Sequence, residues 1–192
     1  MDTNELKKDV TYKIDFDDNR SLHNWSEQYD LTCASSEQIG NIGSSFFVGT
    51  FIGSFILPRA ADIVGRKPMF ILGLVLHIAV VIGLIYATNE TALLGLLALS
   101  GIAETGRYYV AYVYAIEIFS QSHQSTVGMA IFITFSISKV LICLQFMLIP
   151  YRNWLGCAYL SLVMAGLSLF WTLTTMPESP RFLYSKKKFD EC

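Results

Sequence analysis

Residues 70–87 read FILGLVLHIAVVIGLIYA, an apolar stretch interrupted only by His77. A helix of roughly 20 such residues is long enough to cross the hydrocarbon core of a bilayer. A helix of a soluble bundle would instead carry a polar face at helical spacing, and this stretch has none. The stretch therefore predicts a transmembrane helix, which we expect to hold His77 as a packed, hydrogen-bonded residue.

Four further apolar stretches extend this pattern along the chain. Of the 192 residues, 53% are hydrophobic and 16% are charged, whereas soluble domains are typically about 25% charged. We therefore expect an all-α, polytopic transmembrane bundle over residues 39–176, between a polar N-terminal segment (1–38) and a polar tail (177–192). The five expected spans are about 40–57, 70–87, 92–119, 127–149 and 154–175.

Composition also argues against several other classes of protein. The net charge of -2 disfavours nucleic-acid binding, which requires a basic face. The four cysteines, Cys33, Cys143, Cys157 and Cys192, lack the CxxC spacing of zinc or redox sites. We find no nucleophile–base pair, metal-ligand cluster or phosphate-binding loop. The sequence therefore predicts no enzyme, no metal site and no cofactor, and it predicts the lipid bilayer as the surroundings of the chain.

Basic residues are distributed unevenly between the two predicted sides of the membrane. Residues 58–68 and the tail together hold seven, and the two loops on the opposite side hold Arg152 alone. Because Lys and Arg collect on the cytoplasmic side, we expect residues 58–68 and the C-terminus to be cytoplasmic. The charged N-terminal segment would then lie outside, as though a helix were missing in front of it. The seven residues are Arg59, Arg66, Lys67, Arg181, Lys186, Lys187 and Lys188.

The first motif, Asp62-Ile63-Val64-Gly65-Arg66-Lys67, falls between the first two predicted spans. Gly65 permits a tight turn that other residues resist. Asp62 is placed to pair with Arg66 or with a helix end. We interpret this loop as a charge cluster at the membrane surface; the alternative is a simple positively charged anchor.

The second motif, Pro177-Glu178-Ser179-Pro180-Arg181, follows the last predicted span. Its two prolines end the helix and fix a turn. Glu178 and Arg181 would then lie at the cytoplasmic surface, within reach of Arg66 and Asp62. A stop signal with a solvated charge pair is the alternative interpretation.

Several ionisable and aromatic residues fall inside the predicted spans. An ionisable residue at the centre of a span costs at least about 2.5 kcal/mol and needs a partner or an aqueous cavity. Glu104 and Arg107 are three apart and can neutralise each other, so a substrate role and a self-satisfied pair both stay open. Tyr108 and Tyr112 share the Glu104 face, where their rings would either hold an organic cation or pack. Lys139 would either compensate the charge of Glu104 or attract an anionic substrate.

Gly49 and Gly53 are four residues apart on the first predicted span. Small residues at this spacing let two membrane helices approach closely. The pattern predicts a helix contact, and either sliding during gating or static packing is consistent with it.

The order and spacing of the two loop motifs resemble the major facilitator superfamily, and more narrowly its organic cation and organic anion transporter family. Residues 29–33 (YDLTC) resemble the end of that family's large extracellular loop, and residues 151–155 (YRNWL) resemble its turn into the sixth helix. The resemblance covers roughly residues 25–187. It makes the five spans the second to sixth helices of a twelve-helix plan.

The resemblance implies transport of small organic ions by rocking of two halves about a central site. It assigns the gating motifs to Asp62, Gly65, Arg66, Lys67, Glu117, Glu178 and Arg181, and it matches Tyr108 and Tyr112 to aromatic positions that line the family's substrate path. As ionisable residues inside the spans, Glu104, Arg107 and Lys139 complete the candidate substrate cavity.

The chain departs from the family pattern at three positions. Pro58 stands where a glycine usually precedes the loop aspartate by four residues. Gln124 and Ser125 stand where the family has arginines, so Glu117 needs another partner or must protonate.

Five helices supply only one wall of a facilitator-type site, which lies between two halves. We therefore expect a small organic ion as substrate, and a complementary C-terminal half or another membrane subunit as partner. The alternative is a non-transporting membrane subunit of a larger assembly.

Overall fold

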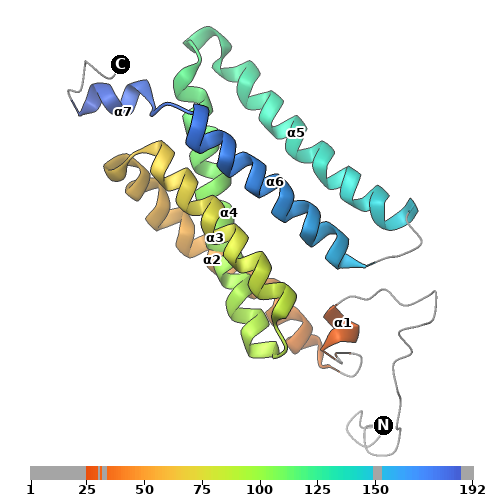
Figure 1. Ribbon diagram of the computed structural model, residues 1–192. Coiled ribbons are helices and arrows are strands. Elements are labelled where there is room, and N and C mark those ends of the chain that lie inside the picture. Colours follow the sequence, from red (N-terminus) through yellow and green to blue (C-terminus); the bar gives the residue numbers. More distant parts are fainter. Residues whose placement is uncertain (1–24, 30, 32–33, 149–152, 187–192) are drawn as a thin grey trace, which may run out of the picture.

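The computed structural model describes residues 25–29, 31, 34–148 and 153–186 (Figure 1). The described part forms helices and no strands. Arg152, Lys187, Lys188, Cys33, Cys192 and most of the predicted N-terminal segment lie outside the described residues. The helices are α1 (Trp25–Gln28), α2 (Ser36–Val64), α3 (Arg66–Tyr86), α4 (Glu90–Ile118), α5 (Gln121–Leu148), α6 (Trp154–Thr175) and α7 (Pro180–Ser185).

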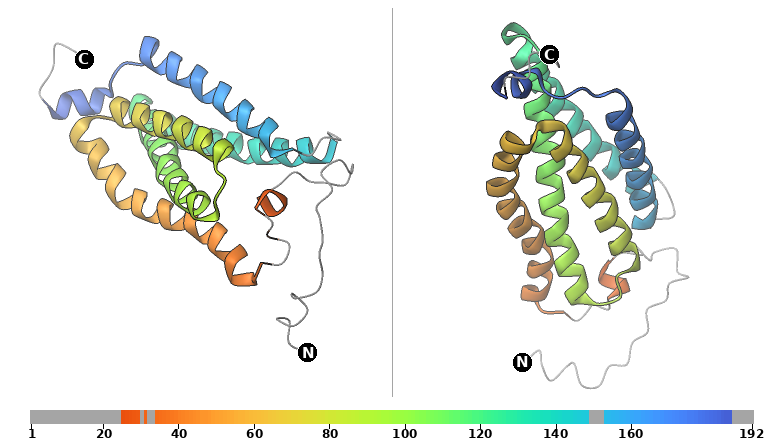
Figure 2. Two further views of the ribbon diagram at one scale, coloured as in Figure 1. Left: turned by 60° about the horizontal axis from the view of Figure 1, so that its bottom comes forward. Right: turned by 60° about the vertical axis from the view of Figure 1, so that its left-hand side comes forward.

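Helix α4 is the centre of the bundle and lies between α2 and α3 (Figure 2). Helix α6 packs on α3, whereas α5 contacts α4 over a limited length and stands away from it toward its C-terminal end (Figure 1). Helices α1 and α7 lie at opposite ends of the bundle (Figure 1). One buried apolar cluster, Val80, Leu84, Leu93 and Leu97, lies beside α1, and a second consists of Ala61, Met69 and Val110.

Glycines set the close approach of α2 and α4. A Cβ atom on Gly49 would lie 1.8 Å from the carbonyl oxygen of Ala98, and one on Gly101 would lie 2.2 Å from that of Phe46. A Cβ atom on Gly53 would lie 3.1 Å from Thr105. The predicted helix contact at Gly49 and Gly53 is therefore confirmed, with α4 as the partner.

Within the described residues, four helices are long and apolar enough to span a membrane: α2, α3, α5 over Gln121–Gln145, and α6, with mean hydropathies of 1.4, 2.6, 2.2 and 1.6. The all-α membrane bundle is thus confirmed. Helix α4, which carries the predicted span 92–119, has 29 residues but is not among the four. It contains Glu104, Arg107 and Glu117, and its central position between α2 and α3 shields much of it from the surroundings.

The structure corrects the extent of the loop predicted at residues 58–68. Helix α2 continues through Pro58 to Val64, and α3 begins at Arg66, so that Gly65 alone joins them. Proline is tolerated in membrane helices because neighbouring groups satisfy the freed backbone carbonyl. The charged motif therefore sits on two helix ends joined by a single residue.

Candidate functional site

The turn at Gly65 requires glycine for two independent reasons. Its φ of 125° and ψ of 158° belong to a region that essentially only glycine adopts. A Cβ atom there would also lie 2.8 Å from Oε2 of Glu178. The sharp reversal between α2 and α3 therefore depends on the absence of a side chain.

Glu178 caps the N-terminus of α3. Its Oε1 accepts hydrogen bonds from the backbone N–H groups of Arg66 (2.9 Å), Lys67 (3.1 Å) and Ser179 (3.0 Å). The first N–H groups of a helix have no intrahelical partner, and they form the positive end of its dipole. The two motifs thus meet as predicted, but through a carboxylate and backbone groups rather than through a pair of charged side chains.

Arg66 joins the ends of α2, α3 and α4. Its Nη1 lies 2.5 Å from Oδ1 of Asp62, and its Nη2 lies 3.1 Å from Oε1 of Glu117. The side chains of Arg66 and Glu117 are 13% and 5% exposed, and that of Asp62 is 65% exposed. Removing one partner of such a buried pair leaves an uncompensated charge, so the Arg66–Glu117 contact is the one on which this end of the bundle depends.

Glu117 has a second partner, Ser179, in addition to Arg66. Its Oε2 accepts a hydrogen bond of 2.5 Å from Oγ of Ser179. Gln124 instead donates through Nε2 to the carbonyl oxygens of Ile116 (3.2 Å) and Phe119 (3.3 Å). Ile116 lies in the last turn of α4 and Phe119 is its C-cap residue, and carbonyls at a helix C-terminus lack helical partners. The loss of the arginines thus leaves Glu117 paired and the end of α4 capped.

Ser179 is a site residue that the sequence reasoning did not assign. It is fully buried, and its Oγ also accepts from the backbone N–H of Phe182 at 3.5 Å, which makes it the N-cap of α7. A serine immediately before a proline is a common start signal for a helix, and that signal was present in the quoted motif. Tyr114 adds a further link by donating to the carbonyl oxygen of Pro177 at 2.9 Å.

A cleft opens beside this cluster, with a volume of about 430 Å³. Arg181 lines it but forms no ion pair with any described residue. Lys67 contributes its backbone N–H to the cluster. The cleft is lined by Asp62, Arg66, Val113, Glu117, Arg181 and Phe182.

The predicted cavity residues lie along α4 and on the facing part of α5. Glu104 and Arg107 form an ion pair, and the Nε atom of Arg107 is buried without a hydrogen-bond partner. The ring of Tyr108 lies 5.1 Å from that of Phe135 on α5. The Nζ atom of Lys139 lies 4.6 Å from the centroid of the same Phe135 ring. Tyr112 forms a comparable pair, 5.7 Å from Phe132.

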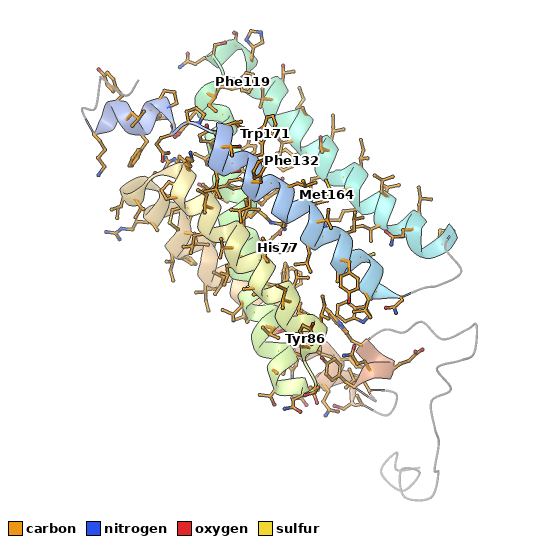
Figure 3. All side chains as sticks on the ribbon, in the orientation of Figure 1. His77, Tyr86, Phe119, Phe132, Met164 and Trp171 are labelled. Carbon is orange, nitrogen blue, oxygen red and sulfur yellow. The ribbon has the colours of Figure 1, made fainter. Side chains whose placement is uncertain are left out.

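His77 joins α3 to α6 (Figure 3). Its Nε2 lies 2.9 Å from Oγ of Ser161. The prediction of a packed, hydrogen-bonded histidine is confirmed.

The opposite end of the bundle is closed by α1 and the turn after it. The Tyr29 hydroxyl donates to the carbonyl oxygen of Ala87 at 3.0 Å, and burial raises the pKa of its phenol, which keeps it a donor. The rings of Trp25 and Trp154 meet edge to face at 5.7 Å. This segment therefore ties the ends of α3 and α6 together.

The apolar helices and their charged end define a multi-pass integral membrane protein. A family model described as sugar (and other) transporter matches residues 9–192. The chain belongs to this family, and its resemblance to the organic cation transporters of the major facilitator superfamily is confirmed.

Named relatives agree with this assignment. The organic cation transporter protein of Drosophila melanogaster is 28% identical over 191 residues, which cover 98% of this chain and 34% of the relative. Solute carrier family 22 member 4 of Mus musculus is 31% identical over 170 residues, 85% of this chain and 29% of the relative. Organic cation/carnitine transporter 2 of Homo sapiens is 29% identical over the same coverage. The chain thus spans about a third of the length of these relatives.

Proposed function

We propose that this chain is part of the N-terminal half of a transporter that moves small organic ions across a membrane by rocking of two halves. The observation that carries the proposal is the cluster around Arg66. In it, one guanidinium binds Glu117 of α4 while Glu178, from the segment after α6, caps α3. A set of ion pairs confined to one end of a bundle can hold that end in one arrangement and release it in another.

The charged end of the bundle is assigned to the cytoplasm. It carries Arg59, Arg66, Lys67, Arg181 and Lys186 in the described residues, and Lys and Arg concentrate on the cytoplasmic side. The C-terminal tail is then cytoplasmic, and α1 lies at the outer surface.

The substrate cavity is assigned to the seam between α4 and α5, with a complementary half as its other wall. The seam is formed by Tyr108 and Tyr112 of α4 and by Phe132, Phe135 and Lys139 of α5. Both α2 and α5 expose large apolar side chains, including Phe51, Phe55, Phe132 and Ile133. Membrane helices with such faces pack on lipid or on further helices. Transporter sites of this kind lie near the midplane, between two halves.

The test is an uptake experiment with the missing part supplied. The 192-residue chain is co-expressed with the remaining portion of the Drosophila relative, and uptake of a labelled organic cation and a labelled organic anion is measured. Uptake above that of each part alone supports the proposal. If both parts insert at the cell surface and no ion enters, the proposal is wrong.

A matched pair of variants checks that the cluster itself matters. Arg66→Gln removes the partner of a buried carboxylate, and we expect it to lower uptake strongly. Arg59→Gln removes the same charge from an exposed position of α2 that forms no ion pair with a described residue, and uptake should persist.

The second candidate function is a non-transporting membrane subunit. It is favoured by the pairing of Glu117 with Ser179, which satisfies this carboxylate without the family's arginines. This function predicts stable co-purification with other membrane proteins and no uptake in the experiment above. Recovery of the chain alone in detergent would count against it.

A further inference from the structure

The charges along the α4–α5 seam do not balance. Glu104 and Arg107 are bound to each other, which leaves a neutral pair on α4. Lys139 on α5 is exposed, and it forms no ion pair with any described residue. The three side chains therefore present a net charge of about +1 at ordinary pH. Any ligand that enters this seam meets one uncompensated cation.

The register of the two helices shows where this cation lies. Helices α4 and α5 run in opposite directions, and Tyr112 meets Phe132 while Tyr108 meets Phe135. Residues four apart on a helix share a face, so Lys139 is the next position beyond Phe135 on the α4-facing side of α5. The contact of its Nζ atom with the Phe135 ring, at 4.6 Å, agrees with this placement.

At the N-terminal end of α5, the position that faces α4 is Gly128. A Cβ atom on Gly128 would lie 3.3 Å from the hydroxyl oxygen of Tyr112. Positions 128, 132, 135 and 139 thus form one continuous stripe on α5, which ends at the lysine. Along this stripe, the rings of Phe132 and Phe135 are followed by the ammonium group of Lys139.

We propose that this seam binds an organic anion that carries an aromatic ring, with its carboxylate or sulfonate on Lys139 and its ring against Phe135 and Tyr108. The inference deepens the proposed function, on which it rests in treating the seam as the cavity. A lysine within a span is costly unless it has a partner. A bound carboxylate supplies a charge-assisted hydrogen bond, which is stronger than the contact with one phenylalanine ring.

The opposite ligand charge is disfavoured at the same place. A cationic ligand would have to separate Glu104 from Arg107 to reach a carboxylate, and Lys139 would repel it. Two of the relatives carry organic cation in their names, whereas the charges of this seam favour the other sign. Lys139 is thus the residue that we expect to determine the charge of the substrate.

The test measures binding and does not depend on uptake. The 192-residue chain and the remaining portion of the Drosophila relative are placed together in phosphatidylcholine nanodiscs, and three fluorinated probes with the same ring are titrated by ¹⁹F NMR. Nanodiscs that hold the remaining portion alone are the blank. The probes are 4-fluorobenzoate, 4-fluorobenzamide and 4-fluorobenzyltrimethylammonium. We expect the benzoate to bind most tightly. Lys139→Gln should raise its Kd roughly tenfold, equivalent to about 1.4 kcal/mol.

Two further variants separate charge from structure. Lys139→Arg keeps the cation and should retain benzoate binding. Lys186→Gln removes the same charge and a similar contact with an aromatic ring, since Lys186 Nζ lies 5.7 Å from the Phe182 ring. It lies at the charged end of the bundle and should leave Kd unchanged.

Three results would overturn the inference: unchanged benzoate binding in Lys139→Gln, equal or tighter binding of the cationic probe, or no binding of any probe above the blank. Organic cation uptake in the co-expression experiment together with any of these would preserve the proposed function and remove the anion site. Benzoate binding without uptake would preserve the anion site and remove the proposed transport function.

Discussion

Replacing Gly65 with alanine should destabilise the bundle by roughly 1.5–5 kcal/mol. Holding a non-glycine residue at the φ of 125° and ψ of 158° found here costs about 1–3 kcal/mol. The new Cβ atom would also lie 2.8 Å from Oε2 of Glu178 and displace the carboxylate that caps α3. Losing such a cap costs about 0.5–2 kcal/mol. The sum of these two effects gives the expected range.

The assay is equilibrium unfolding in mixed detergent micelles, followed by tryptophan fluorescence. Gly95→Ala is the matched control, because a Cβ atom there meets nothing within 4 Å and alanine is the better helix former by about 1 kcal/mol. Amide exchange at Arg66 and Lys67 should accelerate in Gly65→Ala. A free energy of unfolding for Gly65→Ala within about 1 kcal/mol of the wild type would refute the reasoning, since strain and the lost cap together should exceed it.

Three further substitutions probe other contacts by the same unfolding assay. Gly49→Ala should cost more than about 2 kcal/mol, because its Cβ atom would lie 1.8 Å from the Ala98 carbonyl oxygen and an overpacked contact must move apart; Gly43→Ala, with nothing within 4 Å, is its control. Tyr29→Phe removes one hydrogen bond near α1 and should cost about 1 kcal/mol. Ser179→Ala removes a hydrogen bond to a buried carboxylate and should cost about 1.5–3 kcal/mol.

Each of these expectations can fail separately. Equal stabilities for Gly49→Ala and Gly43→Ala would mean that α2 and α4 are not in backbone contact. A neutral Tyr29→Phe would remove the role given to the contact with Ala87. If Ser179→Ala unfolds like the wild type, Arg66 alone satisfies the carboxylate.

The bundle was predictable because its signals are local. Apolar stretches such as residues 154–175 reveal a membrane helix whatever surrounds them, and α6 occupies those residues. The helix ends were less predictable. Pro58 suggested a break, but the packing of α2 on α4 carries the helix through it to Val64. Tertiary contacts decide such boundaries, and no local pattern reports them.

The sequence indicated which residues to consider for the candidate site, but not which of their atoms would meet. The charged loop motif identified Arg66, and the family resemblance identified Glu117. The sequence contained no information on which atoms would meet. Glu178 binds backbone N–H groups, which every residue possesses, and Ser179 reaches Glu117 across 62 residues of chain. Such long-range pairings depend on the three-dimensional arrangement alone.

The cap on α3 has a consequence for synthesis of the chain. The N–H groups of Arg66 and Lys67 are bound by a side chain 112 and 111 residues further along. During translation, α2 to α6 leave the ribosome before Glu178 does, so the start of α3 must rely on water or lipid head groups until then. The turn at Gly65 can form early, but it is locked only when the segment after α6 arrives. The segment after α6 is thus synthesised long after the turn at Gly65, yet its Glu178 side chain completes the hydrogen bonding of that turn.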